Sequence, residues 1–142
     1  MRNGHTLLEL TVAVLLMATI TGSLLPAAAR YRRRADVVAA REAVAGLLAE
    51  ARAVAPAFAG AVVNIESDPG RAWIQISDSV GRTIQIDGAS GLRVVLSGSR
   101  ARTEIAYDAL GVGRVASETL RFRLDGEEAG LTVSGFGRVR RW

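Results

Sequence analysis

The pattern of apolar and polar side chains changes twice along the chain, and each change predicts a different kind of structure. Leu10 to Ala29 holds twenty residues without a charge, enough for a helix of about 30 Å, the hydrocarbon thickness of a bilayer. An apolar stripe with spacings of three and four follows. Beyond Ala61 the apolar positions alternate instead, so we expect an apolar helix, an amphipathic helix and then short strands.

The amphipathic segment continues directly from the apolar one. Charged residues occupy the positions between its apolar ones, so the two segments together predict one helix from near Thr6 to near Val54. Pro56 and Gly60 are expected to end it. The stripe that must be buried consists of Val37, Ala40, Val44, Leu47, Leu48 and Ala51.

The alternating region predicts strands with one buried face. After a first strand, Ala61-Val62-Val63-Asn64-Ile65, the expected inward residues are Ala72, Ile74, Ile76, Ile84, Ile86, Leu92, Val94, Leu96, Leu120, Phe122, Leu124, Leu131 and Val133. The turn signals are Asp68-Pro69-Gly70, Val80-Gly81, Asp87-Gly88, Ser97-Gly98, Gly111 to Gly113 and Asp125-Gly126. The predicted fold class is α+β: a long N-terminal helix packed on an antiparallel sheet or sandwich.

Composition narrows the chemistry. The 142 residues allow one domain besides the apolar segment, and there is no Cys to form a disulfide or a thiolate metal site. The sole histidine is His5, so the domain cannot build a His-based triad or metal cluster. All 18 basic residues are Arg, and the net charge is +4. We therefore expect no enzymatic activity, no metal and no cofactor.

Glu9 is the one acid at the mouth of the uncharged span. An unpaired carboxylate at depth in a membrane costs about 2 to 3 kcal/mol, so Glu9 calls for a partner, which we expect on another chain. Several alternatives compete with this reading. The span is a plain transmembrane anchor, a secretory signal peptide cut after Ala29, or a buried helix of a soluble protein. For Glu9 itself, the competing role is stabilisation of the helix N-terminus.

Residues 1–9 read Met-Arg-Asn-Gly-His-Thr-Leu-Leu-Glu, and the apolar run follows at once. This arrangement resembles a type IV prepilin signal. The resemblance implies that a prepilin peptidase cuts between Gly4 and His5 and methylates the new amino terminus at His5, where the family usually has Phe or Met. It also implies that Glu9 pairs with the amino terminus of a neighbouring subunit in a filament. Pro26 matches the helix-bending proline of type IV pilins.

The resemblance divides the chain into three parts. Residues 1–4 are the leader, residues 5–30 form the transmembrane and filament-core helix, and residues 31–142 form a periplasmic domain, with an amphipathic helix at 35–55 and strands within 61–141. Basic residues give the opposite orientation when counted alone: one stands before the span and four after it, which would place the domain in the cytoplasm. They are Arg2 on one side and Arg30, Arg32, Arg33 and Arg34 on the other.

The C-terminal tail, Leu-Thr-Val-Ser-Gly-Phe-Gly-Arg-Val-Arg-Arg over residues 131–141, ends in a Gly-Arg-Val-Arg motif. With Arg52 and the first strand, it resembles the GspH/FimT group of minor pseudopilins and minor pilins. The resemblance implies a minor pseudopilin of a type II secretion system, in the inner membrane of a bacterium, with other pseudopilins as partners.

Two alternatives to that function stay open. The first is a minor pilin of a type IV pilus that binds DNA through Arg138, Arg140 and Arg141; the competing explanation for these arginines is an edge strand kept soluble by charge. The second is a membrane-anchored β domain unrelated to filaments.

Overall fold

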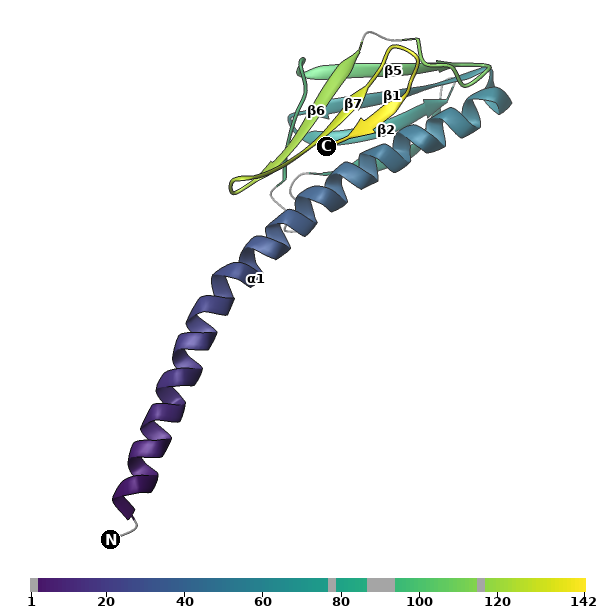
Figure 1. Ribbon diagram of the computed structural model, residues 1–142. Coiled ribbons are helices and arrows are strands. Elements are labelled where there is room, and N and C mark those ends of the chain that lie inside the picture. The colour runs from purple at the N-terminus through teal and green to yellow at the C-terminus, as the bar shows by residue number, and fades with distance from the viewer. Residues whose placement is uncertain (1–2, 77–78, 87–93, 115–116) are drawn as a thin grey trace. The chain divides into compact units, whose positions relative to one another are not determined.

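The computed structural model describes residues 3–76, 79–86, 94–114 and 117–142 (Figure 1). The chain divides into two compact units, which we call the helix unit (Met1–Arg33) and the sheet unit (Arg34–Trp142). The elements in order are α1 (Asn3–Val54), η1 (Ala55–Phe58), β1 (Gly60–Ser67), β2 (Gly70–Ile76), β3 (Ser79–Gln85), β4 (Val95–Ser97), β5 (Arg102–Asp108), β6 (Glu118–Leu124), β7 (Glu127–Val133) and β8 (Val139–Arg141).

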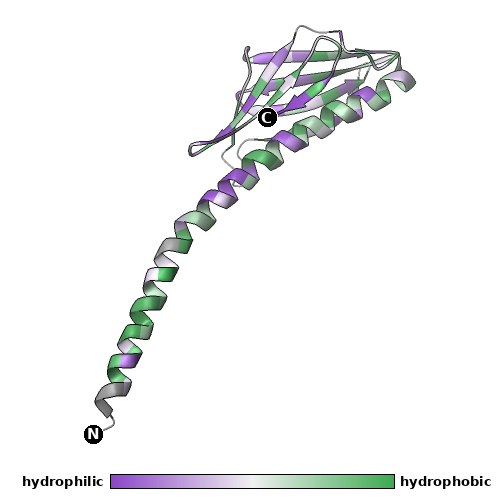
Figure 2. Cartoon of the chain, viewed as in Figure 1, coloured by the Kyte–Doolittle hydropathy of each residue, from purple (hydrophilic) through white to green (hydrophobic). Residues whose placement is uncertain are grey.

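The helix unit is the first part of α1 and is predominantly apolar (Figure 2). Two threonine hydroxyls are satisfied inside the helix: Thr11 Oγ1 donates to the Leu8 carbonyl and Thr19 Oγ1 to the Leu16 carbonyl, each at 2.8 Å. Pro26 lies inside the helix. By length and composition α1 qualifies to cross a membrane, with a mean hydropathy of 1.9 over its most apolar stretch.

The sheet unit contains the second part of α1 and two antiparallel sheets of four strands. Their strand orders are β3-β2-β1-β5 and β4-β6-β7-β8. A two-residue turn joins β6 to β7, with Asp125 at φ 44° and Gly126 at φ 87°. Positive φ at both positions suits a tight hairpin, which is why an Asp-Gly pair stands there.

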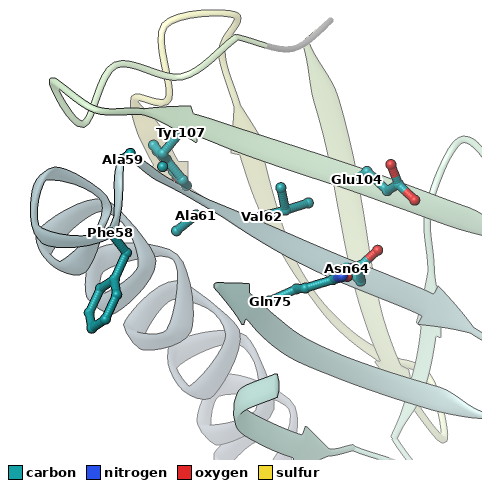
Figure 3. A pocket seen from close by; sticks show the side chains of 9 residues that line it. Phe58, Ala59, Ala61, Val62, Asn64, Gln75, Glu104 and Tyr107 are labelled. Atoms are coloured by element: carbon teal, nitrogen blue, oxygen red, sulfur yellow. The ribbon is translucent and has the colours of Figure 1, made fainter. Parts of the chain in front are cut away.

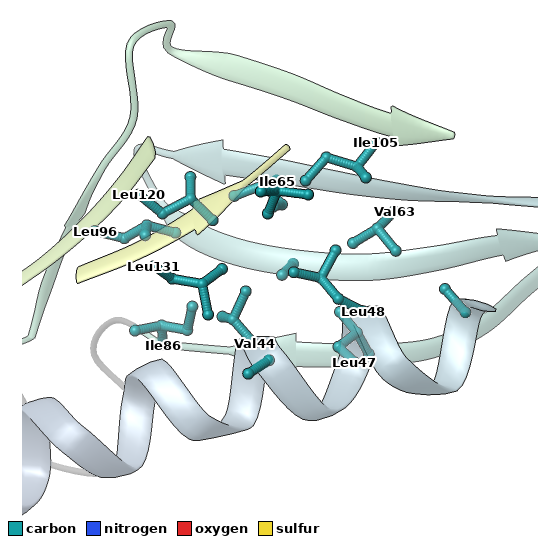
Figure 4. Packing of buried hydrophobic residues seen from close by; sticks show 14 of the residues in the cluster. Val44, Leu47, Leu48, Val63, Ile65, Ile86, Leu96, Ile105, Leu120 and Leu131 are labelled. Carbon is teal, nitrogen blue, oxygen red and sulfur yellow. The ribbon is translucent and has the colours of Figure 1, made fainter. Parts of the chain in front are cut away.

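One hydrophobic core fills the sheet unit. Val44, Leu47 and Leu48 of α1 point toward Ile65 and other apolar residues of the strands (Figure 4). The predicted stripe is confirmed, with Ala40 only partly buried. The predicted inner faces of the strands are likewise confirmed: the fully buried members include Ala72, Ile74, Val94, Leu96, Leu120, Phe122, Leu131 and Val133. The predicted α+β fold class is therefore confirmed.

The sequence analysis was wrong about one turn and missed one strand. Val80-Gly81 lies inside β3, where the register with β2 shifts between Ile74 and Gln75 and leaves Gly81 as the extra residue of a β-bulge. β5 was overlooked because its buried positions include Thr103 and Tyr107, which weaken the apolar alternation. The predicted turn at Asp87-Gly88 and the predicted inward residue Leu92 lie outside the described residues.

Candidate interaction surfaces

The helix unit presents an apolar surface that its own chain does not cover. Its large hydrophobic side chains are between 48% and 69% exposed, which is unusual for a contiguous apolar surface in water. This surface needs lipid or the apolar surface of other helices around it. Its members are Leu7, Leu8, Leu10, Val12, Val14, Leu15, Leu16, Met17, Ile20, Leu24 and Leu25.

Glu9 is exposed on this apolar surface, between Leu8 and Leu10. Gly4 and His5 lie in the same helix, which begins at Asn3. Positions 5 and 9 are one turn apart, so they share a face of the helix. The processing position and the acid predicted from the sequence therefore belong to one short helical segment.

The three arginines predicted to act together at the C-terminus lie in different surroundings. β8 pairs with β7 so that Arg141 is opposite Leu131 and Arg140 is opposite Thr132. Paired residues of an antiparallel ladder share a face. Because Leu131 is buried in the core, Arg141 is on the inner side of the sheet and Arg140 on the outer side.

Arg141 is engaged by the helix. Its Nε donates to Glu42 Oε2 at 3.0 Å, and Arg41 donates to the other oxygen of the same carboxylate at 2.8 Å. The hydrogen bonds from Arg41, followed by the positive charge of Arg141, hold the pKa of Glu42 below its ordinary value. The inner arginine of the tail thus ties β8 to α1.

Arg138 and Arg140 are exposed. The backbone of Arg138 is held by Ser134: its N–H donates to Ser134 Oγ at 3.1 Å and its carbonyl accepts from the Ser134 N–H at 2.9 Å. Neither guanidinium has an ion-pair partner among the residues that the structure describes. These two side chains remain available to a ligand or a partner.

Trp142 lies flat on the outer face of the same sheet. Its backbone exchanges two hydrogen bonds with Gly130, at 2.8 and 3.0 Å, and its Nε1 donates to Thr132 Oγ1 at 3.3 Å. A Cβ at Gly130 would come within 2.1 Å of the indole, so only glycine fits there. Arg121 stacks over the ring at 5.7 Å.

The outer arginines of β6 are less available than those of the tail. Arg121 and Arg123 both bind Glu128, at 3.2 and 2.9 Å. Their charge is therefore shared with a neighbouring carboxylate. The sequence analysis singled out Arg138, Arg140 and Arg141; the structure keeps the first two open and pairs the third.

The first sheet carries a groove of about 540 Å³ on β1 and its neighbours (Figure 3). The floor includes Asn64, whose side chain is 1% exposed in spite of being polar. Its amide donates to Gln75 Oε1 and accepts from Arg102 Nη2, both at 3.3 Å. These partners satisfy the buried amide, and sequence analysis missed the groove because its residues come from different strands.

Within the described ranges no group of three His, Cys, Asp or Glu side chains could hold a metal ion. The buried carboxylate of Glu118 accepts hydrogen bonds from the Ser99 hydroxyl at 2.6 Å and the Ser99 N–H at 2.8 Å. It therefore fastens the loop after β4 and is not poised for chemistry on a ligand.

A long N-terminal helix, whose second part packs on antiparallel sheets, defines a type IV pilin-like fold. The crystal structure of the type IV minor pilin FimU of Pseudomonas aeruginosa (strain PAO1) is similar to this chain, with a TM-score of 0.53. The likeness covers 73% of this chain and 90% of that chain, at 17% sequence identity. No family model matches the chain, and neither does any curated protein sequence.

Proposed function

We propose that this chain is a minor pseudopilin of the GspH/FimT group. It is held in the inner membrane of a bacterium, with the sheet unit in the periplasm, and it assembles with other pseudopilins into a short filament of a type II secretion system. The observation that carries the proposal is the pairing of a pilin-like fold with an uncovered apolar helix that has one acid near its start.

Processing would create the charge that Glu9 needs. A prepilin peptidase hydrolyses the peptide bond between Gly4 and His5, which leaves a carboxylate on Gly4 and an amino group on His5. Methylation of that amine keeps it cationic. Among apolar helices, where the dielectric is low, an unpaired charge is costly, so a pair between this amine and Glu9 of a neighbour removes two penalties at once. A slipped subunit would leave both groups unpaired.

The apolar surface suits two environments in turn. Before assembly, lipid covers the exposed leucines of the helix unit, and hydroxyls such as Thr11 Oγ1 already have acceptors within the helix. During assembly, helices of other subunits replace the lipid at similar cost, because lipid tails are as apolar as leucine. The same side chains therefore serve as an anchor and as a filament core.

The intact mass of the mature protein, purified from a host with a prepilin peptidase, tests this proposal. We expect a chain that begins at His5 and carries one methyl group. Gly4→Leu should retain Met1, whereas Gly22→Ala, where an added Cβ meets nothing within 4 Å, should be processed normally. A chain that begins at Met1 or at Arg30 in wild type would contradict the proposal.

A second candidate is a minor pilin of a type IV pilus that binds DNA. It is favoured by the exposure of Arg138 and Arg140, beside the stacked pair of Arg121 and Trp142. Full-length protein in detergent should then bind double-stranded DNA with a salt dependence, and replacing both arginines with Gln should reduce the slope by about 2. Arg100→Gln, which removes an exposed arginine elsewhere, is the matched control. Equal binding by all three proteins would remove this candidate.

A further inference from the structure

A second, smaller pocket of about 200 Å³ lies in the sheet unit, between α1 and the C-terminal tail. Ala45 and Ala49 of α1 and Val139 of β8 form an apolar part of its lining. Arg52 of α1 and Arg141 of β8 also line it. The pocket thus combines a small apolar wall with two guanidinium groups.

The donors of this pocket are not used up by the protein. Arg52 has no ion pair or hydrogen bond with the side chains that the structure describes. Arg141 commits its Nε to Glu42, and its two terminal nitrogens have no recorded partner among the described residues. A fork with two free N–H groups is the geometry that binds a carboxylate.

Tyr107 completes the lining from β5. Its side chain is buried, and burial raises its pKa, although the positive charge of Arg52 opposes this increase. The hydroxyl therefore stays protonated at neutral pH and remains a donor. It forms no hydrogen bond within the described part of the chain, so it has a free N–H-like role to offer to an oxygen of a ligand.

Two glycines shape the pocket. Gly137 has φ 75°, and a Cβ there would be 2.7 Å from Tyr107 Cε1. Gly111 has φ 70°, and a Cβ there would be 3.0 Å from the Arg52 carbonyl oxygen. The loops before β8 and after β5 can lie this close to the tyrosine and the helix only because both residues are glycine.

We propose that this pocket binds the carboxylate of an acidic side chain from a neighbouring subunit. The two guanidinium groups hold the carboxylate oxygens, and the apolar wall of Ala45, Ala49 and Val139 covers the methylene stem. A glutamate side chain has both parts, whereas inorganic phosphate has no stem for that wall. That the carboxylate belongs to another subunit rests on the proposed function; the carboxylate site itself does not.

The two tyrosines of the chain provide a site-specific measurement. Tyr107 lines the pocket, and Tyr31 lies in the helix unit, 77% exposed. Full-length protein in detergent, labelled with 3-fluorotyrosine, is titrated with N-acetylglutamate methylamide at constant ionic strength. We expect the fluorine resonance of Tyr107 to move saturably while that of Tyr31 stays fixed. The glutamine analogue, which has the same shape without the charge, should cause no shift.

Matched variants separate binding from folding. Arg52→Gln and Arg141→Gln should each weaken binding of the probe at least tenfold, and Arg100→Gln should not change it. Glu42→Gln keeps both pocket arginines and frees the Nε of Arg141, so it should bind the probe at least as tightly as wild type. A Tyr107 resonance that ignores the probe, or that responds only to inorganic phosphate, would overturn the proposal.

The source of the carboxylate is tested in cells that assemble filaments. A photo-crosslinking residue at Ala49, on the exposed rim of the pocket, should capture another pilin-like subunit through a peptide that contains an acidic residue. Arg52→Glu should abolish that crosslink without changing the mature N-terminal mass. Normal crosslinking by Arg52→Glu would contradict the pocket alone, whereas an unprocessed wild-type chain would contradict the proposed function alone.

Discussion

The two parts of α1 have the same secondary structure and opposite environments. In the sheet unit, one stripe of the helix is buried by strands, with Leu47 and Leu48 fully covered. In the helix unit, leucines such as Leu15 and Leu25 are about two-thirds exposed, at 66% and 65%. A stripe of apolar residues is satisfied by one partner surface inside the chain, whereas a helix that is apolar all round requires surroundings that the chain does not contain. The difference separates what folds this protein from what it assembles with.

The largest effect should come from truncating a leucine on the covered side. Leu48→Ala should lower the free energy of unfolding of the sheet unit by about 2 to 5 kcal/mol, because it removes apolar contacts and leaves a cavity. Denaturant titration of the full chain in detergent measures this, since both tryptophans, Trp73 and Trp142, lie in the sheet unit. Leu15→Ala is the matched change on the uncovered side and should leave the transition where it is. An equal loss from both substitutions would refute the contrast.

The next effect concerns the acid on the uncovered side. Glu9→Gln should leave membrane insertion intact and reduce incorporation into the filament at least tenfold, because the amine of a neighbour then stays unpaired among apolar helices. Crosslinking to other subunits, normalised to the amount in the membrane, gives the measurement. Glu104→Gln, an exposed acid in the sheet unit, should assemble normally. Wild-type incorporation of Glu9→Gln would remove the proposed pair.

Two glycines sharpen the comparison further. Gly130→Ala should destabilise the sheet unit by about 1 to 3 kcal/mol, because the new methyl group must displace the indole of Trp142. Gly46→Ala meets nothing within 4 Å on the exposed side of α1 and should stabilise the protein by about 0.5 to 1 kcal/mol. Denaturant midpoints with unchanged slopes would measure both. Equal signs for the two substitutions would contradict this account of the packing.

The smallest effect is the pH dependence of the contact between β8 and α1. The pKa of Glu42 is lowered from its ordinary value of 4.5 in the folded protein. Its contribution is therefore fully present above about pH 4.5 and is lost as the pH falls through the lowered value. The pair is exposed, so the stability difference between wild type and Glu42→Gln should be about 0.2 to 1 kcal/mol near pH 7. It should shrink toward zero in acid, and a constant difference would show that the charge has no role.

Hydrophobic spacing predicted most of the fold, since the positions that the core requires repeat with a helical or a strand period. It failed where another constraint acted on the backbone. Gly81 reads as a turn residue in the sequence, yet it is the extra residue of a bulge, a feature set by the pairing of β3 with β2. Thr103 and Tyr107 hid β5 because partly polar residues fill its inner positions.

The interaction surfaces were only partly predictable. Glu9 and the apolar run are contiguous in the sequence, so a local motif reveals them. The pocket joins Arg52, Tyr107 and Arg141, which are far apart along the chain and meet only through the register of β8 on β7. That register also separates Arg141 from Arg140, although the two are adjacent in the sequence.

The way Trp142 is held has a practical consequence for labelling the protein. Arg41 donates to its carbonyl at 3.1 Å and Gly130 donates to the same oxygen at 2.8 Å, so an epitope fused directly after this residue would start from a seam between helix and strand. The hairpin at Asp125-Gly126 is open, with nothing within 4 Å of a Cβ built on the glycine. Short epitopes inserted there should report on the native molecule, while those placed after the tryptophan would loosen the edge they are meant to mark.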